Sequence, residues 1–301
     1  MNKLSVVISA FNEEKNIEDC LKSVTFAKEI ILIDNESTDN TAIIAKRYTD
    51  KIFSLPNNLM LNINKNAGFS KATGEWILNL DADERVTPEL EEEISNVLGN
   101  SRSKINGYSI PRKNIIFGKW IQHGLWWPDY QLRLFKKGKG RFPEEEIHEH
   151  LKVEGDTEKL SNPITHYNYN SIYQYLDKMN RIYTENGAEL YLKTGKRVTW
   201  REAITMPAND FLKTYFLQSG YKDGLHGLIL SLLQAFYAEV VFAKAWEKKG
   251  FLSEKIELSE FNNEVKKHQK AYRYWITKVK ADESQNLLEK IYYRLLHKLA
   301  K

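Results

Sequence analysis

Residues 77–85 read ILNLDADER, an apolar run that ends in three acids, Asp81, Asp83 and Glu84. Two carboxylates separated by a single residue repel each other, and their pKa values rise unless a cation shares the site. Oxygen ligands suit Mg²⁺ or Mn²⁺, and Mg²⁺ usually takes one or two carboxylates, keeps several waters and bridges to phosphate groups. An Asp-x-Asp pair at a strand end therefore predicts a site for a metal-bound diphosphate.

The same acids also fit a plainer role at the start of a helix. A helix is expected at Pro88–Leu98, and acids that precede a helix stabilise the positive end of its dipole. Taken alone, the segment leaves both interpretations open. Two further polar groups, Asp34 and the pair Asn12 and Glu13, follow other apolar runs in the same way and favour a ligand site.

The elements that must position these groups alternate along the chain. Short apolar runs typical of strands occupy Leu4–Ser9, Glu29–Ile33, Ile52–Leu55 and Trp76–Leu80. Helices are expected between them, at Asn16–Val24, Ser37–Tyr48 and Ala67–Thr73. Wholly apolar strands that alternate with helices predict an α/β fold whose parallel sheet is covered on both faces. Ligands of such sheets bind beyond the carboxyl ends of the strands, which is where the polar groups lie.

Three segments carry a family resemblance: VVISAFNEEKNIEDCLKSV, EIILIDNESTDNTAIIAKRY and NKNAGFSKATGEWILNLDADE. In this order and at these distances they resemble the nucleotide-sugar half of family 2 glycosyltransferases. The resemblance implies the GT-A fold, a Rossmann-like and mostly parallel central sheet with helices on both faces. The expected division is a nucleotide-sugar-binding half at residues 1–100, an acceptor half at 101–165 and a helical, membrane-associating region at 166–301.

The resemblance also assigns roles to single residues. Asp83 would be the principal ligand of Mg²⁺ or Mn²⁺, with Asp81 helping it and contacting the diphosphate. Lys65 stands where a basic residue often precedes the family's Asn-x-Gly segment. The residues expected to hold uridine are Phe11, Asn12, Glu13 and Asp34. Asn35 departs from the pattern, since many members carry a second acid at this position.

Transfer of a sugar with inversion also needs a base that accepts the proton of the attacking hydroxyl. The strand-like DYQLRLF and the later Ile147-His148-Glu149 resemble segments of bacterial enzymes that add sugars to the lipopolysaccharide core. By that resemblance Glu149 is the expected base, Asp129 is its rival, and His148 completes the metal shell or contacts the diphosphate. Ordinary surface roles for Glu149 and His148 remain open alternatives.

An aromatic group lies in the same half of the chain. Trp126 and Trp127 are adjacent, so both cannot point inward from a regular strand. Sugar rings pack on indoles, which makes an acceptor platform one interpretation. A core role is the other, and for Trp120 it is favoured.

Beyond residue 162 the sequence becomes helical. A Tyr-rich helix is expected at Tyr167–Tyr191, Pro207 is expected to open the next segment, and Leu225–Ala243 is almost entirely apolar. Polar residues on several sides of that last segment favour a buried or interfacial helix over a membrane-spanning one. Residues 258–301 predict one or two charged helices. Residues 244–301 hold 14 Lys and Arg against 8 Asp and Glu, which suits an anionic lipid surface as well as a solvated helix.

Composition bounds the function. The chain has 301 residues, is 42% hydrophobic and contains the single Cys20, which indicates a folded protein in a reducing, cytosolic compartment. The N-terminus turns polar too soon for a secretory signal. No zinc spacing, RNA-recognition signature or phosphate-binding loop is present, so a nucleic-acid partner is not expected.

We therefore expect an inverting, metal-dependent hexosyltransferase peripherally bound to the inner face of the cytoplasmic membrane. Its expected donor is a UDP-sugar, with UDP-glucose among the candidates. Its expected acceptor is a lipid-linked saccharide, such as the lipopolysaccharide core or another cell-envelope glycan. The alternatives are a polyprenyl-phosphate sugar transferase, a nucleotidyltransferase and a non-catalytic sugar-nucleotide-binding scaffold.

Overall fold

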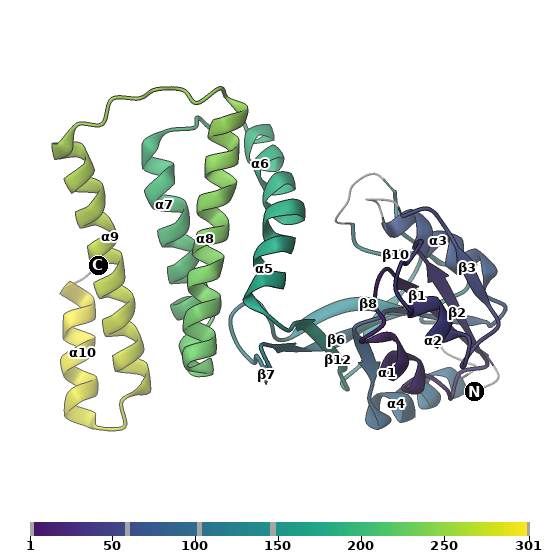
Figure 1. The fold of residues 1–301 in the computed structure, drawn as a ribbon. Helices are drawn as coiled ribbons and strands as arrows, with labels where there is room; N and C mark the ends of the chain where they lie inside the picture. The colour runs from purple at the N-terminus through teal and green to yellow at the C-terminus, as the bar shows by residue number, and fades with distance from the viewer. Residues whose placement is uncertain (1–2, 58–60, 101–103, 145–148, 300–301) are drawn as a thin grey trace. The chain divides into compact units, whose positions relative to one another are not determined.

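The computed structural model describes residues 3–57, 61–100, 104–144 and 149–299 (Figure 1). The chain divides into two compact units, which are described separately. The first unit contains Met1–Ile116 and Trp126–Asn168, and the second contains Phe117–Leu125 and Tyr169–Lys301.

The first unit is built on a mixed sheet with the strand order β3-β2-β1-β4-β8-β6-β12-β5. Its strands are β1 (Leu4–Ala10), β2 (Glu29–Asp34), β3 (Ile52–Ser54), β4 (Trp76–Asp81), β5 (Glu84–Val86), β6 (Gly107–Ile116), β8 (Asp129–Lys136), β11 (Thr157–Lys159) and β12 (Ile164–Tyr169), and a small ribbon is formed by β9 (Gly140–Arg141) and β10 (Lys152–Val153). Strands β1 to β4 are parallel, while β8 runs antiparallel to β4 and to β6. The α/β prediction is confirmed.

The strand register gathers the predicted polar groups at one rim. Ala10 at the end of β1 is paired with Asp34 of β2. On the other side of β1, Ser9 is paired with Asp81 of β4. Because the three strands are parallel, the loops that follow them lie at the same edge of the sheet.

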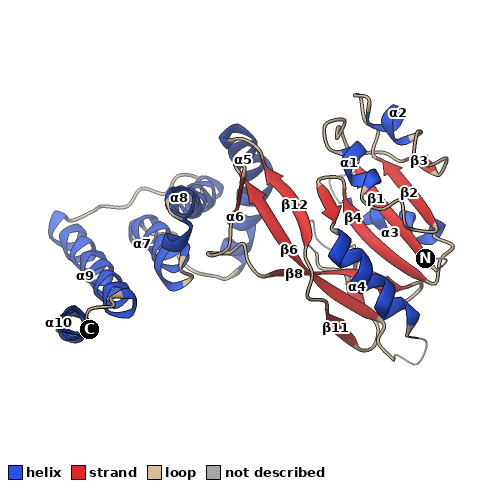
Figure 2. Ribbon diagram, turned by 90° about the horizontal axis from the view of Figure 1, so that it is seen from below, coloured by secondary structure: helices blue, strands red, loops and turns tan. Residues whose placement is uncertain are grey.

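Helices cover both faces of these parallel strands (Figure 2). The helices α1 (Ile17–Lys22), α2 (Thr41–Ala45) and α4 (Pro88–Gly99) pack on the face that carries Val6 and Ile8. The helix α3 (Leu61–Lys71) packs on the opposite face, which carries Val7 and Ile33. A Cβ on Gly68 of α3 would lie 2.6 Å from Val7 Cγ1. Glycine therefore permits α3 to approach the sheet closely, and this approach brings Lys65 to the rim.

Two helices of the first unit differ most from the expected bounds. Helix α2 starts at Thr41, later than the expected Ser37, because the preceding residues bond to the loop after β1: Thr38 N donates to Asn12 Oδ1 at 2.8 Å. Helix α3 is longer than the expected Ala67–Thr73. Its first turns are rich in asparagine and poor in helix formers, and they are held by tertiary contacts such as Asn64 to Asn35.

The second unit is helical, as predicted for the carboxyl-terminal region. Its elements are β7 (Lys119–Trp120), α5 (Ile172–Lys178), the π-helical turn η1 (Met179–Tyr183), α6 (Thr184–Lys193), α7 (Trp200–Phe211), the π-helical turn η2 (Leu212–Leu217), the 3₁₀ turn η3 (Gly220–Asp223), α8 (Leu225–Lys248), α9 (Leu258–Glu283) and α10 (Leu287–Leu299). Helix α8 packs against α6 and α7, and α10 packs against α9. The expectation of one or two charged helices after residue 258 corresponds to the two helices α9 and α10.

Two expectations about this region were wrong. Tyr167–Tyr169 belongs to β12 and not to a helix, because Tyr167 N donates to Asp83 O at 2.9 Å and holds the segment in the sheet. Pro207 lies inside α7 and does not open a new segment. Pro207 cannot donate the usual backbone hydrogen bond. Packing of α7 against α8 stabilises the helix in spite of this loss.

Within the described residues, one helix, α8, is long and apolar enough to cross a membrane by length and composition. One third of its most apolar window is buried inside the structure, and the core helix of a soluble protein meets the same criterion. Gln234 on this helix donates to Asp210 of α7 at 3.0 Å. Its polar side is therefore used in packing.

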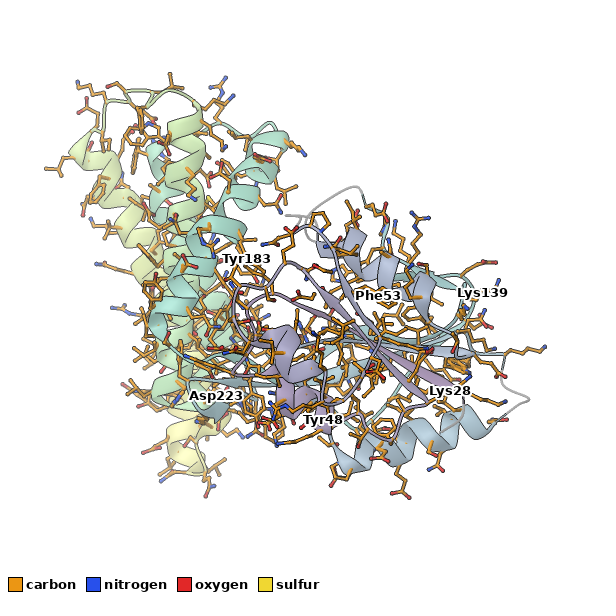
Figure 3. The ribbon with its side chains drawn as sticks, turned by 45° about the vertical axis from the view of Figure 1, so that its right-hand side comes forward. Lys28, Tyr48, Phe53, Lys139, Tyr183 and Asp223 are labelled. Atoms are coloured by element: carbon orange, nitrogen blue, oxygen red, sulfur yellow. The ribbon has the colours of Figure 1, made fainter. Side chains whose placement is uncertain are left out.

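The loop Phe117–Leu125 belongs to the helical unit because one buried carboxylate holds it there. Asp223 of η3, labelled in Figure 3, accepts hydrogen bonds from Gln122 N at 3.2 Å and His123 N at 2.9 Å. Lys119 Nζ donates to the Asp223 carbonyl at 2.7 Å.

Candidate active site

Helix α3 presents three polar side chains on one face at the rim. Asn62, Lys65 and Asn66 are three and four residues apart, a spacing that places them side by side on a helix. Lys65 Nζ lies 2.6 Å from Asp81 Oδ1. The second oxygen of Asp81 lies 2.6 Å from Arg133 Nη2 of β8. Asp81 therefore has a cationic partner at each carboxylate oxygen.

The pairing continues away from Asp81. Arg133 Nη2 also lies 2.6 Å from Glu84 Oε1, and Glu84 is completely buried. Burial opposes ionisation of Asp81, but Arg133 and Lys65 outweigh it and hold its pKa well below the usual range. Asp81 and Glu84 thus fix the end of β4 to β8 and α3. Two of the three clustered acids are therefore neutralised by ion pairs within the protein.

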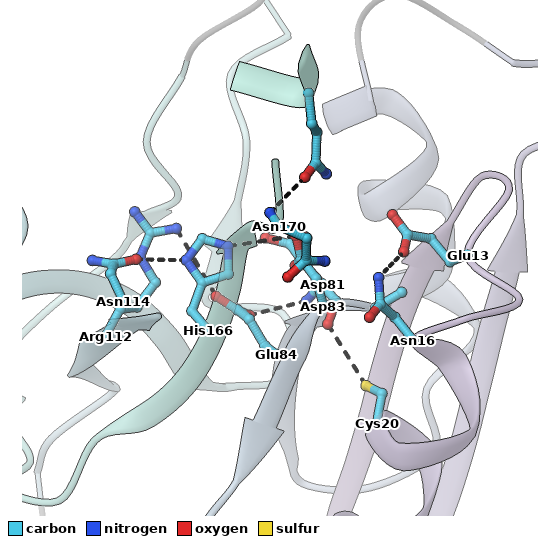
Figure 4. Close-up of polar contacts among 12 residues, drawn as sticks. Glu13, Asn16, Cys20, Asp81, Asp83, Glu84, Arg112, Asn114, His166 and Asn170 are labelled. Atoms are coloured by element: carbon cyan, nitrogen blue, oxygen red, sulfur yellow. Dashed lines mark hydrogen bonds and ion pairs between the residues drawn. The ribbon is translucent and has the colours of Figure 1, made fainter. Parts of the chain in front are cut away.

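Asp83 has different surroundings, because it faces a histidine. Strand β12 runs antiparallel to β5 and places His166 opposite Glu84, next to Asp83. Asp83 Oδ2 lies 3.5 Å from His166 Nε2 (Figure 4). Both side chains are largely buried, with 16% and 9% of their surfaces exposed.

The orientation of His166 is set by a further residue. His166 Nδ1 lies 2.7 Å from Asn114 Oδ1, and Asn114 Nδ2 donates to Trp126 O at 2.8 Å. Because the amide nitrogen already has an acceptor, its oxygen must face the ring and accept the Nδ1 proton. In the neutral imidazole, Nε2 then carries a lone pair directed toward Asp83.

Histidine and carboxylate donors of this kind fit a divalent cation. A ligating histidine commonly donates its other ring N–H to an oxygen, as His166 does here. Among the residues that the structure describes, no group of three or more His, Cys, Asp and Glu side chains converges. Mg²⁺ that binds a diphosphate usually takes one or two carboxylates from the protein, and Asp83 is a candidate for one of them.

His148 was the histidine expected at this site from the sequence, and His166 was not expected there. Residue 148 lies outside the described residues, so its role stays a prediction. His166 is far from Asp83 along the chain, and no motif spacing connects the two. The weak signal was a polar side chain in the alternating segment ITHYNY of β12.

The expected nucleoside residues form two interlocked loops. Asn12 has a positive φ of 54° and accepts a hydrogen bond from Thr38 N at 2.8 Å, while its own N–H donates to Ser37 Oγ at 3.0 Å. Glu13 N donates to Thr41 Oγ1 at 2.7 Å. These bonds tie the loop after β1 to the loop after β2.

Phe11 and Asp34 lie at the same rim but differ in exposure. The Phe11 side chain is exposed, as a ring that stacks on a base would need to be. Asp34 is buried and accepts a hydrogen bond from Ser37 N at 3.3 Å.

Asn35, the residue that departs from the family pattern, is an internal connector. Its Nδ2 donates to Ala10 O at 2.9 Å and to Ser9 Oγ at 3.0 Å, and its Oδ1 accepts from Asn64 Nδ2 at 2.6 Å. An acid could not supply the two donors. The asparagine thus joins β1, β2 and α3 and does not point to a ligand.

The two candidate bases occupy different surroundings. Glu149 Oε2 accepts from Glu144 N at 2.7 Å and lies 3.4 Å from Asn62 Nδ2 of α3. Asn66 Nδ2 donates to Phe142 O at 2.9 Å, so Phe142 and Glu149 both contact the helix that presents Lys65. Glu149 therefore lies on the α3 side of the site.

Asp129 lies on the His166 side. Its carboxylate accepts from Arg112 Nε at 2.8 Å and from Gln131 Nε2 at 2.8 Å. Burial raises the pKa of Asp129, but the Arg112 charge and these hydrogen bonds lower it below the usual value. A carboxylate held in this way is a weaker base than an ordinary one.

The aromatic residues Trp126 and Trp127 are half-buried in the first unit. The carbonyl of Trp126 accepts the hydrogen bond that orients Asn114. Trp120 is half-buried in the second unit. Their role as an acceptor platform stays a prediction.

Comparison with known proteins identifies the class. A family model described as Glycosyl transferase family 2 matches residues 5–150. The lipopolysaccharide core biosynthesis glycosyltransferase LpsC of Rhizobium meliloti (strain 1021) is 28% identical over 253 residues, covering 81% of this chain and 92% of that protein. An uncharacterized glycosyltransferase of Rickettsia typhi is 30% identical over 260 residues, covering 82% and 88%. The chain belongs to glycosyltransferase family 2 and is related to a lipopolysaccharide core glycosyltransferase.

Solved structures show more distant likeness. Residues 1–349 of TarS from Staphylococcus aureus match with a TM-score of 0.42 and 16% identity, covering 80% of this chain and 91% of that one. Glucosyl-3-phosphoglycerate synthase of Mycobacterium tuberculosis, in complex with Mn²⁺ and uridine-diphosphate-glucose, matches with a TM-score of 0.32 and 21% identity, covering 36% and 43%. The sheet and helices described above are the GT-A arrangement expected for the family.

Proposed function

We propose that the protein transfers a hexosyl group, with inversion, from a UDP-sugar to a lipid-linked saccharide of the lipopolysaccharide core or a related cell-envelope glycan. The observation that carries the proposal is the pair of Asp83 and His166, 3.5 Å apart, with Asn114 orienting the imidazole. The relative named for lipopolysaccharide core biosynthesis supports the acceptor class. Family membership supports the reaction class.

The donor would bind along the rim of the parallel strands. The exposed Phe11 would stack on the uracil, and Asp34, with the loop of Asn12 and Glu13, would accept hydrogen bonds from the nucleoside. Asp83 and His166 would hold Mg²⁺ or Mn²⁺ beside the diphosphate. Asp81, already paired with Lys65 and Arg133, would align these two cations toward the phosphate oxygens, and it stays a second candidate ligand of the metal.

The chemistry requires stabilisation of the departing diphosphate and removal of a proton from the acceptor. A divalent cation, when bound, neutralises charge that develops on the diphosphate. Lys65 adds positive charge at the same rim. Glu149 would accept the proton of the attacking hydroxyl. The groups that hold it, Glu144 N and Asn62, are uncharged, whereas Asp129 is paired with the Arg112 cation.

The proposed location is the cytoplasmic face of the inner membrane, where a lipid-linked acceptor is accessible. The basic and aromatic character of residues 244–301 supports a peripheral association. Helix α8, which packs on α6 and α7, is not required to span the bilayer in this proposal.

Calorimetric titration of the purified protein with UDP, GDP, CMP and ADP, each with and without Mn²⁺, tests the proposal. We expect Mn²⁺-dependent binding of UDP that the Asp83→Asn variant loses. Asp50→Asn, which removes an exposed carboxylate from the same unit, serves as the matched control and should bind like the unmodified protein. Indifference to all four nucleotides would contradict the proposal and favour a scaffold function. If the protein binds UDP but transfers sugar to polyprenyl phosphate and not to a saccharide, the proposed acceptor class is wrong and polyprenyl phosphate replaces it.

A further inference from the structure

Helix α10 contacts α9 through Tyr293 and His297. His297 Nδ1 lies 3.2 Å from Tyr274 O of α9, and the rings of these two residues are 4.2 Å apart. Lys280 of α9 lies 5.0 Å from the ring centroid of Tyr293. Positions 293 and 297 are four apart, so one stripe of α10 makes the contact with α9.

The opposite side of α10 is apolar and exposed. Its residues recur at helical spacing, and we call them the outer face of α10: Leu287, Leu288, Ile291, Tyr292 and Leu295, all exposed in the structure. Leu287 and Leu288 leave 70% and 77% of their surfaces in contact with solvent. A helix of a soluble protein normally directs its apolar stripe toward its neighbours, whereas this stripe of α10 is open to solvent. An apolar patch of this kind marks an interaction surface.

Positive charge lies beside the outer face. Lys290, Arg294 and Lys298 are spaced by four residues and form a stripe along one edge of it, and Glu289 is the single acid of the helix. A basic stripe next to an apolar stripe is the pattern of a helix that lies in the interface of an anionic bilayer. A second copy of the chain would offer the same positive stripe with Glu289 as the single acid of the helix, so it fits this surface less well.

We propose that the outer face of α10 docks the protein on an anionic phospholipid bilayer. The apolar side chains would enter the boundary between headgroups and acyl chains, and Lys290, Arg294 and Lys298 would contact lipid phosphates. The inference deepens the proposed function, because it names the element that brings the enzyme to a lipid-linked acceptor. It is tested without any sugar transfer.

The test is flotation of the full-length protein with vesicles of phosphatidylcholine alone and with added phosphatidylglycerol. We expect binding to the anionic vesicles, weakened at about 1 M salt, where electrostatic screening is strong. The double variant Leu288→Ser with Leu295→Ser should lower the partition coefficient by about tenfold or more. Arg294→Gln with Lys298→Gln should remove the preference for anionic lipid while the fold, followed by circular dichroism, stays unchanged.

The control is Ile43→Ser on α2 of the first unit, which changes a side chain that is 65% exposed and should leave vesicle binding intact. Vesicle binding that is absent, or equal in the serine double variant, would overturn the proposal. So would a dimer that the serine double variant converts to a monomer, since a second copy would then occupy the face. Donor binding separates the two proposals: unmodified protein that floats with anionic vesicles but does not bind UDP would contradict only the proposed function.

Discussion

Asn114 Oδ1 lies 2.7 Å from His166 Nδ1, and the opposite ring nitrogen lies 3.5 Å from Asp83 Oδ2. The three side chains come from β6, the β4–β5 turn and β12, and antiparallel pairing of β12 with β5 brings two of them together. An asparagine without any charge thus decides which nitrogen of the histidine faces the candidate metal site.

Removing Asn114 should weaken metal binding without touching a metal ligand. We expect Asn114→Leu to raise the Kd for Mn²⁺ in the presence of UDP by about 10–100-fold, because the imidazole loses its fixed orientation. Electron paramagnetic resonance of free Mn²⁺ measures this directly. His166→Ala should lower affinity at least as much. Unaltered Mn²⁺ binding in His166→Ala would remove His166 from the site and return His148 to consideration.

Glu149→Gln should separate donor binding from turnover. The variant should bind UDP and Mn²⁺ normally. Its kcat should fall by about 10²–10⁴-fold, because the amide cannot take the proton from the attacking hydroxyl of the acceptor. Steady-state transfer assays beside calorimetry give both quantities. The exposed Glu158→Gln is the matched control.

Asp129→Asn distinguishes the rival assignment. If Glu149→Gln transfers sugar at the normal rate while Asp129→Asn does not, Asp129 is the base, in spite of its pairing with Arg112. We expect the reverse order of effects.

Glu29, remote from the candidate base, makes stability depend on pH. Burial raises its pKa, but hydrogen bonds from Lys51, Ser5 and Thr73 outweigh burial and lower the pKa from 4.5 to about 2. A lowered folded-state pKa contributes stability above the unfolded-state value, and that contribution is lost as pH falls from about 4.5 toward 2.

Glu29→Gln should therefore be less stable than the unmodified protein by about 1–3 kcal/mol at pH 7, with the gap narrowing in acid. Urea unfolding between neutral pH and about pH 3 measures the gap. The exposed Glu92→Gln should show no such dependence. A gap that is constant with pH would mean that the charge of Glu29 is not the cause.

Asn35→Asp, which restores the acid common in the family, should destabilise this chain. The carboxylate would face Ala10 O and Ser9 Oγ without donating to either, at a cost of about 3 kcal/mol. Thermal unfolding beside the exposed Asn96→Asp control measures the difference. Equal stability of the two variants would show that Asn35 is not an essential connector.

The sequence was sufficient for what depends on local pattern. Apolar runs such as Trp76–Leu80 predicted buried strands directly. The location of Asp34, Asp81 and Asp83 at one rim of the sheet followed from their positions at strand ends. Boundaries were less certain, as α2 and α3 show, because side-chain bonds between distant loops decide where a helix begins. Long-range contacts also explain why Tyr167–Tyr169, which were expected in a helix, form part of strand β12.

Only the tertiary structure could show that the three acids at the end of β4 and beyond it have different partners. Asp81 and Glu84 are neutralised by Arg133, while Asp83 faces His166. Neither partner is close in sequence, and no spacing rule links a carboxylate to residues that antiparallel strands bring beside it much later. The direction of α10's apolar side was equally hidden, because a helical repeat gives the faces of a helix but not which face its neighbour covers.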